Sequence, residues 1–150
     1  MGYDSDELMK LENQLCFPLY AAARNVTNLY TPLLKPLGLT YTQYIVFLVL
    51  WEKDDVPVGE ICERLWLDNG TVTPLLKKMQ AEGYIEKHRS EKDDRVVAVT
   101  LTEKGKRLQE QVKDVPLRVG RCIGLSEDKA KELYTLLYEL LGNQKTDKEK

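Results

Sequence analysis

The fold is decided by residues 58–102, which read VGEICERLWLDNGTVTPLLKKMQAEGYIEKHRSEKDDRVVAVTLT. In the middle of this stretch, Val72, Leu75, Leu76 and Met79 recur at the spacing of one buried helical face. Asp68 can cap the start of this helix, and Gly83 can end it. Pro74 lies inside the helix and is expected to loosen or kink its second turn.

The face opposite this apolar stripe is polar. It carries short hydrogen-bonding groups near the start of the helix and cations further along, namely Asn69, Thr71, Thr73, Lys77 and Lys78. A helix that reads the major groove needs this arrangement, because its first residues approach base edges while hydroxyls and lysines hold phosphates. The pattern therefore predicts a recognition helix.

A short helix is predicted before the recognition helix, and a hairpin after it. The short helix has its apolar stripe at Val58, Ile61, Cys62 and Leu65, which gives the pair helix-turn-helix spacing. Two strand-like runs, YIEKHR and VVAVTL, are separated by the polar turn SEKDDR. Lys92 and Arg95 at the tip can reach a minor groove or phosphates. We expect a mainly α-helical fold with a small β wing, a winged helix-turn-helix at about residues 55–102.

Charge supports nucleic-acid binding only locally. Residues 70–107 hold nine Lys or Arg against six Asp or Glu, whereas residues 1–69 hold five against ten. A whole-chain net charge of −2 does not exclude DNA binding, because charges further than about 10 Å from a phosphate are screened. A helix pair and hairpin in another small fold, with a solvated charged turn, is an equally good explanation of the charges alone.

The composition argues against several other classes of protein. A chain of 150 residues suits one domain, and it has no leader-like segment and no apolar run of about 20 residues, so we expect a cytoplasmic protein that does not enter a membrane. Cys16, Cys62 and Cys122 are odd in number and widely spaced, and His88 is the only histidine. Disulfide frameworks, zinc sites and His-based catalysis lose support. We expect no catalytic residue, cofactor or metal, and therefore no enzyme.

Long helices are predicted on both sides of the winged segment. The first covers about residues 6–35, with a cap at Ser5 and a bend allowed at Pro18, and the others cover about 103–142, with caps at Thr102 and Ser126. Between them, YIVFLVLWE is a buried helix from near Thr42, although its β-branched content also allows a strand. The polar tail at 143–150 is expected to be disordered.

These long helices carry more apolar surface than the winged core can cover. A second copy of the chain would cover it, so we expect a homodimer. Its recognition helices would lie about one DNA turn, roughly 34 Å, apart and would bind a palindromic operator in double-stranded DNA.

Over residues 8–142 the chain resembles the MarR family of transcriptional regulators, in particular its organic hydroperoxide sensing branch, the OhrR type. The general part of the resemblance is LDNGTVTPLLKKMQAEGYI followed by RSEKDDRVVAVTLTEKG. The specific part is LENQLCFPLYAAAR, with a cysteine four residues before a tyrosine, together with LYTPLL and GLTYTQY. The resemblance implies one MarR-type domain over residues 1–150 and a repressor function.

The resemblance also implies a peroxide sensor. It places the reactive thiol at Cys16 and the tyrosines that hydrogen-bond its sulfur, from the same chain or the partner, at Tyr30 and Tyr41, with Tyr20 nearby. Phenol donors stabilise the reactive thiolate. Walls from Phe17, Tyr20 and Phe47 would favour organic hydroperoxides. Some members of the branch have a second cysteine that forms an intersubunit disulfide, and Cys122 matches its position, whereas a partly buried apolar role is the alternative.

Two positions depart from the family pattern. Pro18 follows the sensor cysteine where a helix-compatible apolar residue is usual, and Asn69 stands where serine is frequent. The family's DNA contacts carry over to Asn69, Thr71, Thr73 and Lys77, and to Arg95 in the wing, which Asp93 or Asp68 would orient. We expect Cys62 to be a small buried side chain and His88 an ordinary strand residue.

Three other functions compete with a peroxide-sensing repressor. The first is a MarR-type repressor released by a small aromatic ligand. The second is a thiol peroxidase in which Cys16 turns over, and the third is a winged helix used only for protein contacts. They differ in whether the response needs Cys16, whether peroxide is consumed continuously, and whether duplex DNA is bound with a salt dependence.

Overall fold

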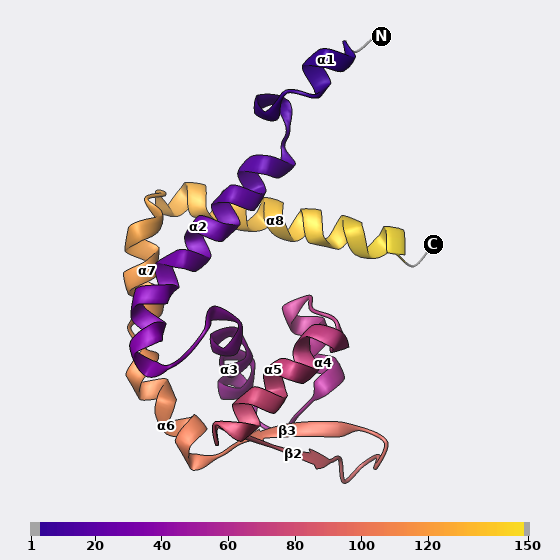
Figure 1. Cartoon of the computed structure of the whole chain (residues 1–150), viewed down its shortest axis with the longest axis vertical. Helices are drawn as coiled ribbons and strands as arrows, with labels where there is room; N and C mark the ends of the chain where they lie inside the picture. The colour runs from indigo at the N-terminus through magenta and orange to yellow at the C-terminus, as the bar shows by residue number, and fades with distance from the viewer. Residues whose placement is uncertain (1–3, 149–150) are drawn as a thin grey trace. The chain divides into compact units, whose positions relative to one another are not determined.

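A computed structural model describes residues 4–148 (Figure 1). In chain order its elements are α1 (Ser5–Leu8), η1 (Leu11–Asn13), α2 (Cys16–Leu34), η2 (Lys35–Leu37), α3 (Tyr41–Glu52), β1 (Val56–Pro57), α4 (Val58–Leu65), α5 (Asn69–Ala81), β2 (Ile85–Arg89), β3 (Val97–Leu101), α6 (Glu103–Val112), α7 (Val115–Ile123) and α8 (Glu127–Lys148). The fold is mainly α-helical with a small β wing, as predicted. The chain divides between Val119 and Gly120 into two compact units, which are described separately.

The helix-turn-helix consists of α4 and α5. Helix α4 ends where Trp66 adopts a left-handed conformation with φ 56° and the Leu67 amide donates to the Cys62 carbonyl at 3.0 Å. Asp68 then caps α5, because its carboxylate accepts a 2.8 Å hydrogen bond from the Thr71 amide. Gly83, with φ 80°, follows the end of α5, so both predicted limits of the recognition helix are confirmed.

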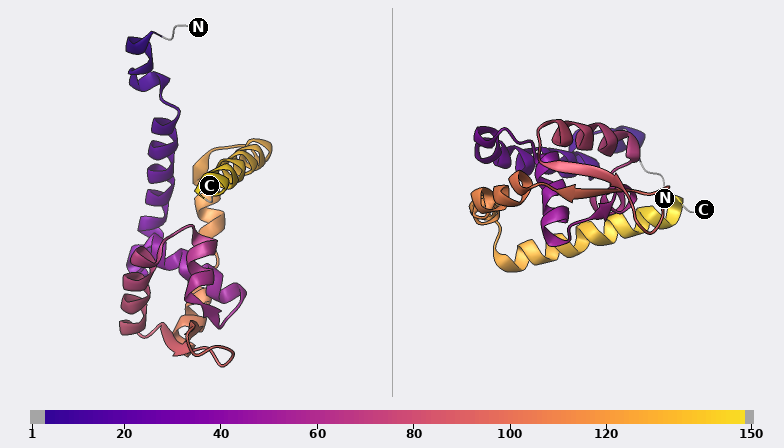
Figure 2. Two further views of the ribbon diagram at one scale, coloured as in Figure 1. Left: turned by 90° about the vertical axis from the view of Figure 1, so that its right-hand side faces the viewer. Right: turned by 90° about the horizontal axis from the view of Figure 1, so that it is seen from below.

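The wing is the hairpin of β2 and β3, which is visible in both views of Figure 2. Its register pairs Ile85 with Leu101 and Arg89 with Val97. The sheet has a third strand, β1, which pairs antiparallel with β3 and gives the order β1-β3-β2. Strand β1 is not among the predicted elements, because a strand of two residues has no periodicity to detect.

Helix α3 forms the centre of the core. Thr40 caps it with a capping box, in which Gln43 accepts from the Thr40 amide at 3.0 Å while Thr40 accepts from the Gln43 amide. The predicted buried helix is therefore confirmed over the strand alternative. Phe47 is fully buried and stacks on Trp51 at 5.1 Å between ring centroids. The expectation that Phe47 forms a wall of the sensor site is wrong, because core packing takes the whole side chain.

The predicted long first helix is broken. Residues 4–15 form only one short helical turn and one 3-10 turn, and the uninterrupted helix α2 begins at Cys16 (Figure 2). Pro18 is the reason: in the first turn it needs no amide donor, but its ring excludes the Gln14 carbonyl that a longer helix would place against it. Pro18 thus starts the helix rather than bending it. The cap of α1 is Asp4 and not Ser5, since Asp4 accepts from the Asp6 amide.

The predicted caps after the wing are confirmed. Thr102 accepts from the Gly105 amide at 3.2 Å, and Ser126 accepts from the Lys129 amide at 3.4 Å. Gly120 lies inside α7, and Gly124, with φ 74°, follows its end. Residues 143–150 were expected to be disordered, but helix α8 continues to Lys148, so this expectation is wrong for residues 143–148. Residues 149–150 lie outside the described residues.

Between residues 4 and 148, no single helix combines the length and the apolar character needed to cross a membrane. The segments Cys16–Leu37 and Tyr41–Glu52 meet that measure only as a pair, which is bent by 81°.

Candidate DNA interface and cysteine site

The polar face of α5 is exposed, as predicted. Asn69, Thr71, Thr73, Lys77 and Lys78 are all exposed, whereas Val72, Leu76 and Met79 on the other side of the helix are buried and Leu75 is half-buried. The hydrogen bond from the Thr71 amide, together with that from its hydroxyl, lowers the pKa of the Asp68 carboxyl. Asp68 therefore stays ionised at the start of the helix, where a negative charge is favourable.

The cations of this face are available to phosphates. In the part of the chain that the structure describes, Lys77, Lys78 and Lys92 take part in no ion pair. A lysine without an internal partner can release a condensed counterion when it meets a phosphate. The face can thus supply charge along the helix and short donors and acceptors at its start.

The wing tip is a closed, hydrogen-bonded turn. The Ser90 amide donates to the Val96 carbonyl at 2.8 Å, and the Arg89 guanidinium donates to the Asp94 carbonyl at 2.7 Å. Arg95, whose side chain is 88% exposed, donates from Nε to Asp93 Oδ1 at 3.1 Å and from Nη2 to Asp93 Oδ2 at 3.2 Å. These bonds lower the pKa of Asp93. Of the two carboxylates predicted to orient Arg95, the structure selects Asp93.

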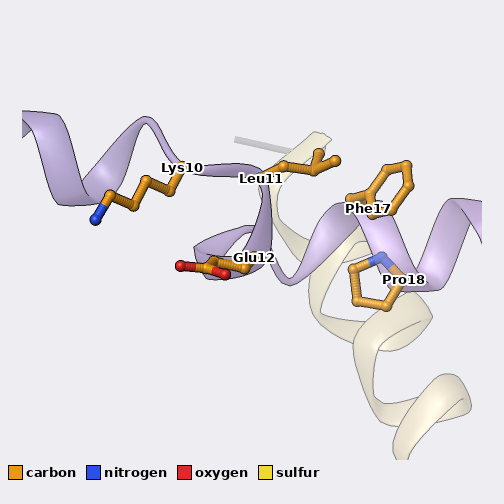
Figure 3. Close-up of a pocket in the computed structure, with 5 residues that line it drawn as sticks. All are labelled: Lys10, Leu11, Glu12, Phe17 and Pro18. Atoms are coloured by element: carbon orange, nitrogen blue, oxygen red, sulfur yellow. The ribbon is translucent and has the colours of Figure 1, made fainter.

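Cys16 is the first residue of α2, and its thiol is exposed. The residues that follow and precede it in sequence form an open hollow, lined by Lys10, Leu11, Glu12, Phe17 and Pro18 (Figure 3). Tyr20 lies one turn further along α2; it is exposed, and the Arg24 guanidinium lies 5.4 Å from its ring centroid. The thiol is therefore open to solvent in the single chain.

A cluster of three tyrosines lies where α2 meets α3. The ring centroids of Tyr30 and Tyr41 are 4.8 Å apart, and Tyr44 lies 5.5 Å from Tyr30 and 6.4 Å from Tyr41. Burial raises the pKa of all three phenols, that of Tyr44 to about 12 with a further contribution from Tyr30 and Tyr41. They remain protonated at neutral pH and can act as hydrogen-bond donors. Tyr44 was missed in the sequence because it falls in an almost wholly apolar run.

The structure does not bring Cys16 and this cluster together in one chain. Cys16 and Tyr30 are separated by fourteen residues of the same helix, which corresponds to about 21 Å along its axis. No side chain spans that distance. Tyr30 therefore cannot donate a hydrogen bond to Cys16 of its own chain. The same holds for Tyr41, because its ring contacts that of Tyr30.

The other two cysteines differ in exposure. Cys122 lies in the last turn of α7, and its thiol is exposed in the single chain. Cys62 is buried, as expected, with 9% of its surface exposed, but its thiol also donates a 3.3 Å hydrogen bond to Asn69 Oδ1. This contact links α4 to the start of the recognition helix and is absent from any pattern in the sequence.

A helix-turn-helix with an exposed polar face on its second helix, followed by a hydrogen-bonded wing with a charged tip, is the arrangement of a winged helix-turn-helix DNA-binding protein. Residues 28–112 match the family of transcriptional regulators SarA/Rot. The chain is 48% identical over 136 residues to an organic hydroperoxide resistance transcriptional regulator of Bacillus subtilis, covering 89% of this chain and 90% of that protein. The chain belongs to the MarR/SarA family of DNA-binding transcriptional regulators and is not an enzyme.

Solved structures agree with this assignment. Reduced AbfR bound to DNA, a protein of Staphylococcus epidermidis, has a TM-score of 0.76 and 34% identity, with 93% of this chain and 97% of that chain covered. Disulfide-formed AbfR has a TM-score of 0.64 and 34% identity, over 91% and 96%. A cysteine-to-serine mutant of MarR from E. coli, complexed with operator DNA, shares the fold, with a TM-score of 0.78 and 23% identity over 85% and 93%.

The family match covers only part of the candidate site. It includes α4, α5 and the wing, and also Tyr30, Tyr41 and Tyr44, but neither Cys16 nor Cys122. The family model therefore says nothing of the two exposed cysteines, whose role requires a separate argument.

Proposed function

We propose that this protein is a cytoplasmic, homodimeric repressor that senses organic hydroperoxides by oxidation of Cys16 and then releases a palindromic operator. The observation that carries the proposal is the separation of an exposed thiol from three protonated phenols on one chain. In a twofold dimer, the thiol of one chain meets the tyrosines of its partner. The similarity to an organic hydroperoxide resistance regulator along most of both chains supports a response to organic hydroperoxides.

Exposed apolar side chains supply the dimer surface. Leu8, Met9, Leu11 and Leu15 are each more than half exposed in the segment that leads into α2. In the other unit, α8 exposes Leu133, Tyr134, Leu136 and Tyr138. Apolar surface on this scale is rare on monomers, and a second copy that covers both segments would bury it.

The chemistry at Cys16 transfers one oxygen atom. The thiolate sulfur attacks an oxygen of the hydroperoxide, the O–O bond breaks, and the leaving alkoxide takes a proton to become an alcohol, so the sulfur becomes a sulfenic acid. Phenol donors stabilise the negative charge on sulfur before the attack. The apolar hollow at Leu11, Phe17 and Pro18 would receive the organic part of the peroxide.

Cys122 is assigned the second step. Its thiol attacks the sulfenic sulfur of the partner's Cys16, a disulfide forms, and water leaves with the two hydrogens and the sulfenic oxygen. Exposure of the Cys122 thiol supports this role, and a related regulator is known in a disulfide form. A small external thiol could replace Cys122 in this reaction. It would attack the sulfenic sulfur, water would leave, and Cys16 would carry a mixed disulfide.

Release of DNA requires that oxidation and DNA binding favour different separations of the two recognition helices. Each tenfold loss of operator affinity corresponds to about 1.4 kcal/mol of coupling free energy. The DNA contacts in this proposal are Asn69, Thr71, Thr73, Lys77 and Lys78 on α5 and Lys92 and Arg95 in the wing.

The test treats reduced protein with one equivalent of cumene hydroperoxide and compares non-reducing gels, intact mass and duplex binding for the wild type, Cys16→Ser and Cys122→Ser. The expected result is a dimer-sized band that needs both cysteines and a loss of DNA binding that needs Cys16. A mass increase of one oxygen at Cys16 without the band would assign the second step to an external thiol. Oxidised and reduced protein with equal affinity for DNA would contradict the proposal and favour a repressor released by a small aromatic ligand.

A further inference from the structure

One hydrogen bond joins the two helices of the helix-turn-helix through their side chains. Cys62 Sγ lies 3.3 Å from Asn69 Oδ1, and the thiol donates to the amide oxygen. Cys62 belongs to α4 and is buried, whereas Asn69 is the first residue of α5 and is exposed. A buried, fixed group thus holds one end of an exposed side chain at the place where a recognition helix meets DNA.

The position of the sulfur is set by the turn itself. The Cys62 carbonyl accepts the Leu67 amide at 3.0 Å, and the left-handed Trp66 lies between them. The backbone of Cys62 is therefore held on one side by α4 and on the other by the turn. Its side chain is buried in the core, where close packing restricts rotation of the thiol, so the contact orients the amide group.

We propose that Cys62 is a positioning residue for DNA recognition, which fixes the Asn69 amide so that its Nδ2 group presents two hydrogen-bond donors to an acceptor on the DNA. That acceptor is an atom of a base edge in the major groove, such as purine N7, guanine O6 or thymine O4, or else a phosphate oxygen. The inference rests on the proposed contact of Asn69 with DNA and specifies that Asn69 is the hydrogen-bond donor in it.

The opposite orientation of the amide would recognise different groups. With its oxygen outward, Asn69 would accept hydrogen bonds from the amino group of cytosine or adenine. It would then direct its own N–H groups at the sulfur of Cys62, which is a weak acceptor. With its oxygen on the Cys62 thiol, Asn69 keeps both Nδ2 donors for DNA.

The test uses a duplex selected by the reduced wild type from a pool with a randomised central region. Affinities are measured for this duplex, for each of its single-base-pair variants, and for a non-specific duplex of equal length. Cys62→Ser keeps a donor and is expected to bind as the wild type does. Cys62→Val, of similar size but without a donor, is expected to lose roughly two- to tenfold of the discrimination at one base pair per half-site if the acceptor is a base, or of the affinity for every duplex, at an unchanged melting temperature, if the acceptor is a phosphate.

Variants of Asn69 identify the chemistry of the contact. Asn69→Asp removes both donors and adds a negative charge, so it is expected to lose at least as much affinity as Asn69→Ala. If the acceptor is a phosphate, neutral methylphosphonate at one backbone position abolishes the effect of Asn69→Ala, and base changes do not. If the acceptor is a base, replacement of one base pair per half-site abolishes the effect of Asn69→Ala, and methylphosphonate does not.

Three results would overturn the inference. Cys62→Val could weaken binding to every duplex equally, in parallel with a lower melting temperature, which would make Cys62 merely structural. Asn69→Asp could gain a preference for cytosine or adenine, which would show that the oxygen faces the DNA. Asn69→Ala could bind every duplex as the wild type does. Failure of the wild type to bind any duplex would contradict the proposed repressor function itself and is distinguishable from these.

Discussion

Gln43 Nε2 donates a 3.0 Å hydrogen bond to Glu82 Oε2 and so ties α3 to the end of the recognition helix. Gln43 is only 1% exposed, and its other amide atom accepts from the Thr40 amide. The side chain is thus shared between the cap of α3 and the last residues of the helix-turn-helix. It lies next in sequence to Tyr44 of the tyrosine cluster.

Replacement of Gln43 by Leu leaves a carboxylate oxygen of Glu82 and the Thr40 amide without these partners. We expect the free energy of unfolding to fall by about 1 to 3 kcal/mol, because partly buried polar groups that lose a hydrogen bond retain their desolvation cost. Urea unfolding followed by circular dichroism measures the change. Glu82→Gln, which keeps an acceptor, should cost clearly less, and equal losses for both variants would contradict this assignment.

Gly105 provides a second test of the core. A Cβ atom at this position would lie 2.3 Å from the Tyr84 carbonyl oxygen, where backbone cannot move aside easily. Gly105→Ala is expected to lower the free energy of unfolding by at least about 2 kcal/mol. Gly120→Ala is the matched control, because no atom lies within 4 Å of its added Cβ and alanine favours a helix. A Gly105→Ala protein as stable as the wild type would refute the close approach.

His88 links the wing to the loop before β1. Its Nδ1 lies 2.9 Å from the Arg89 carbonyl oxygen and its Nε2 lies 2.8 Å from Asp55 Oδ1, so both ring nitrogens face acceptors and both donate when the ring is protonated. The hydrogen bond to Arg89, followed by the contact with Asp55, raises the pKa of His88. Because the folded pKa is raised, the stabilisation is fully present below the unfolded value of about 6.5 and is lost as the pH rises through the folded pKa.

The expected consequence is a difference in pH dependence between the wild type and His88→Asn. The melting temperature of the wild type should exceed that of the variant at about pH 6, and the gap should narrow toward about pH 8. Asp55→Asn should reduce the same gap, since it removes the carboxylate partner. A gap that is constant with pH would show that the protonated ring makes no specific contribution.

The tyrosine donors are predicted to act across the dimer. Tyr30→Phe combined with Tyr41→Phe should slow oxidation of Cys16 by cumene hydroperoxide by roughly tenfold or more, since hydrogen bonds to charged groups are the strong ones. Tyr84→Phe, whose ring packs on Phe47 in the core, is the control and should react at the wild-type rate.

Mixed dimers decide which chain supplies the phenols. When one chain carries Cys16→Ser and the other carries both tyrosine changes, the remaining thiol faces an intact partner cluster and should react at the wild-type rate. When all three changes are in one chain, the thiol of its wild-type partner should react slowly. The reverse order of rates would show that the tyrosines act within their own chain.

Much of the winged segment could be predicted from sequence because its signals are local. Helix α5 follows from a 3.6-residue apolar period between a capping Asp68 and a left-handed Gly83, and the wing from two alternating runs around a charged turn. The exposed cysteines and two of the clustered tyrosines came from family resemblance. That resemblance did not decide whether donors and thiol belong to one chain, which the length of α2 answers.

Other features could not be predicted because they depend on distant or weak determinants. The interruption before Cys16 competes with a continuing apolar period, and the deciding factor is the ring of Pro18. An aromatic side chain such as that of Phe47 suits a pocket wall as well as a core, and only its contacts with Trp51 and Tyr84 show that it lies in the core. The bond between Cys62 and Asn69 joins residues seven positions apart on two helices, so only the geometry of the turn brings them together.

The length of α2 also has a consequence for the amount of protein in a cell. In the proposed dimer, a thiol and its phenols meet only when two chains associate, so a lone chain carries an ordinary surface cysteine. Rapid oxidation would then appear only above the dissociation constant of the dimer, together with tight operator binding. Newly made, dilute protein would be spared from peroxide until enough copies had accumulated to repress.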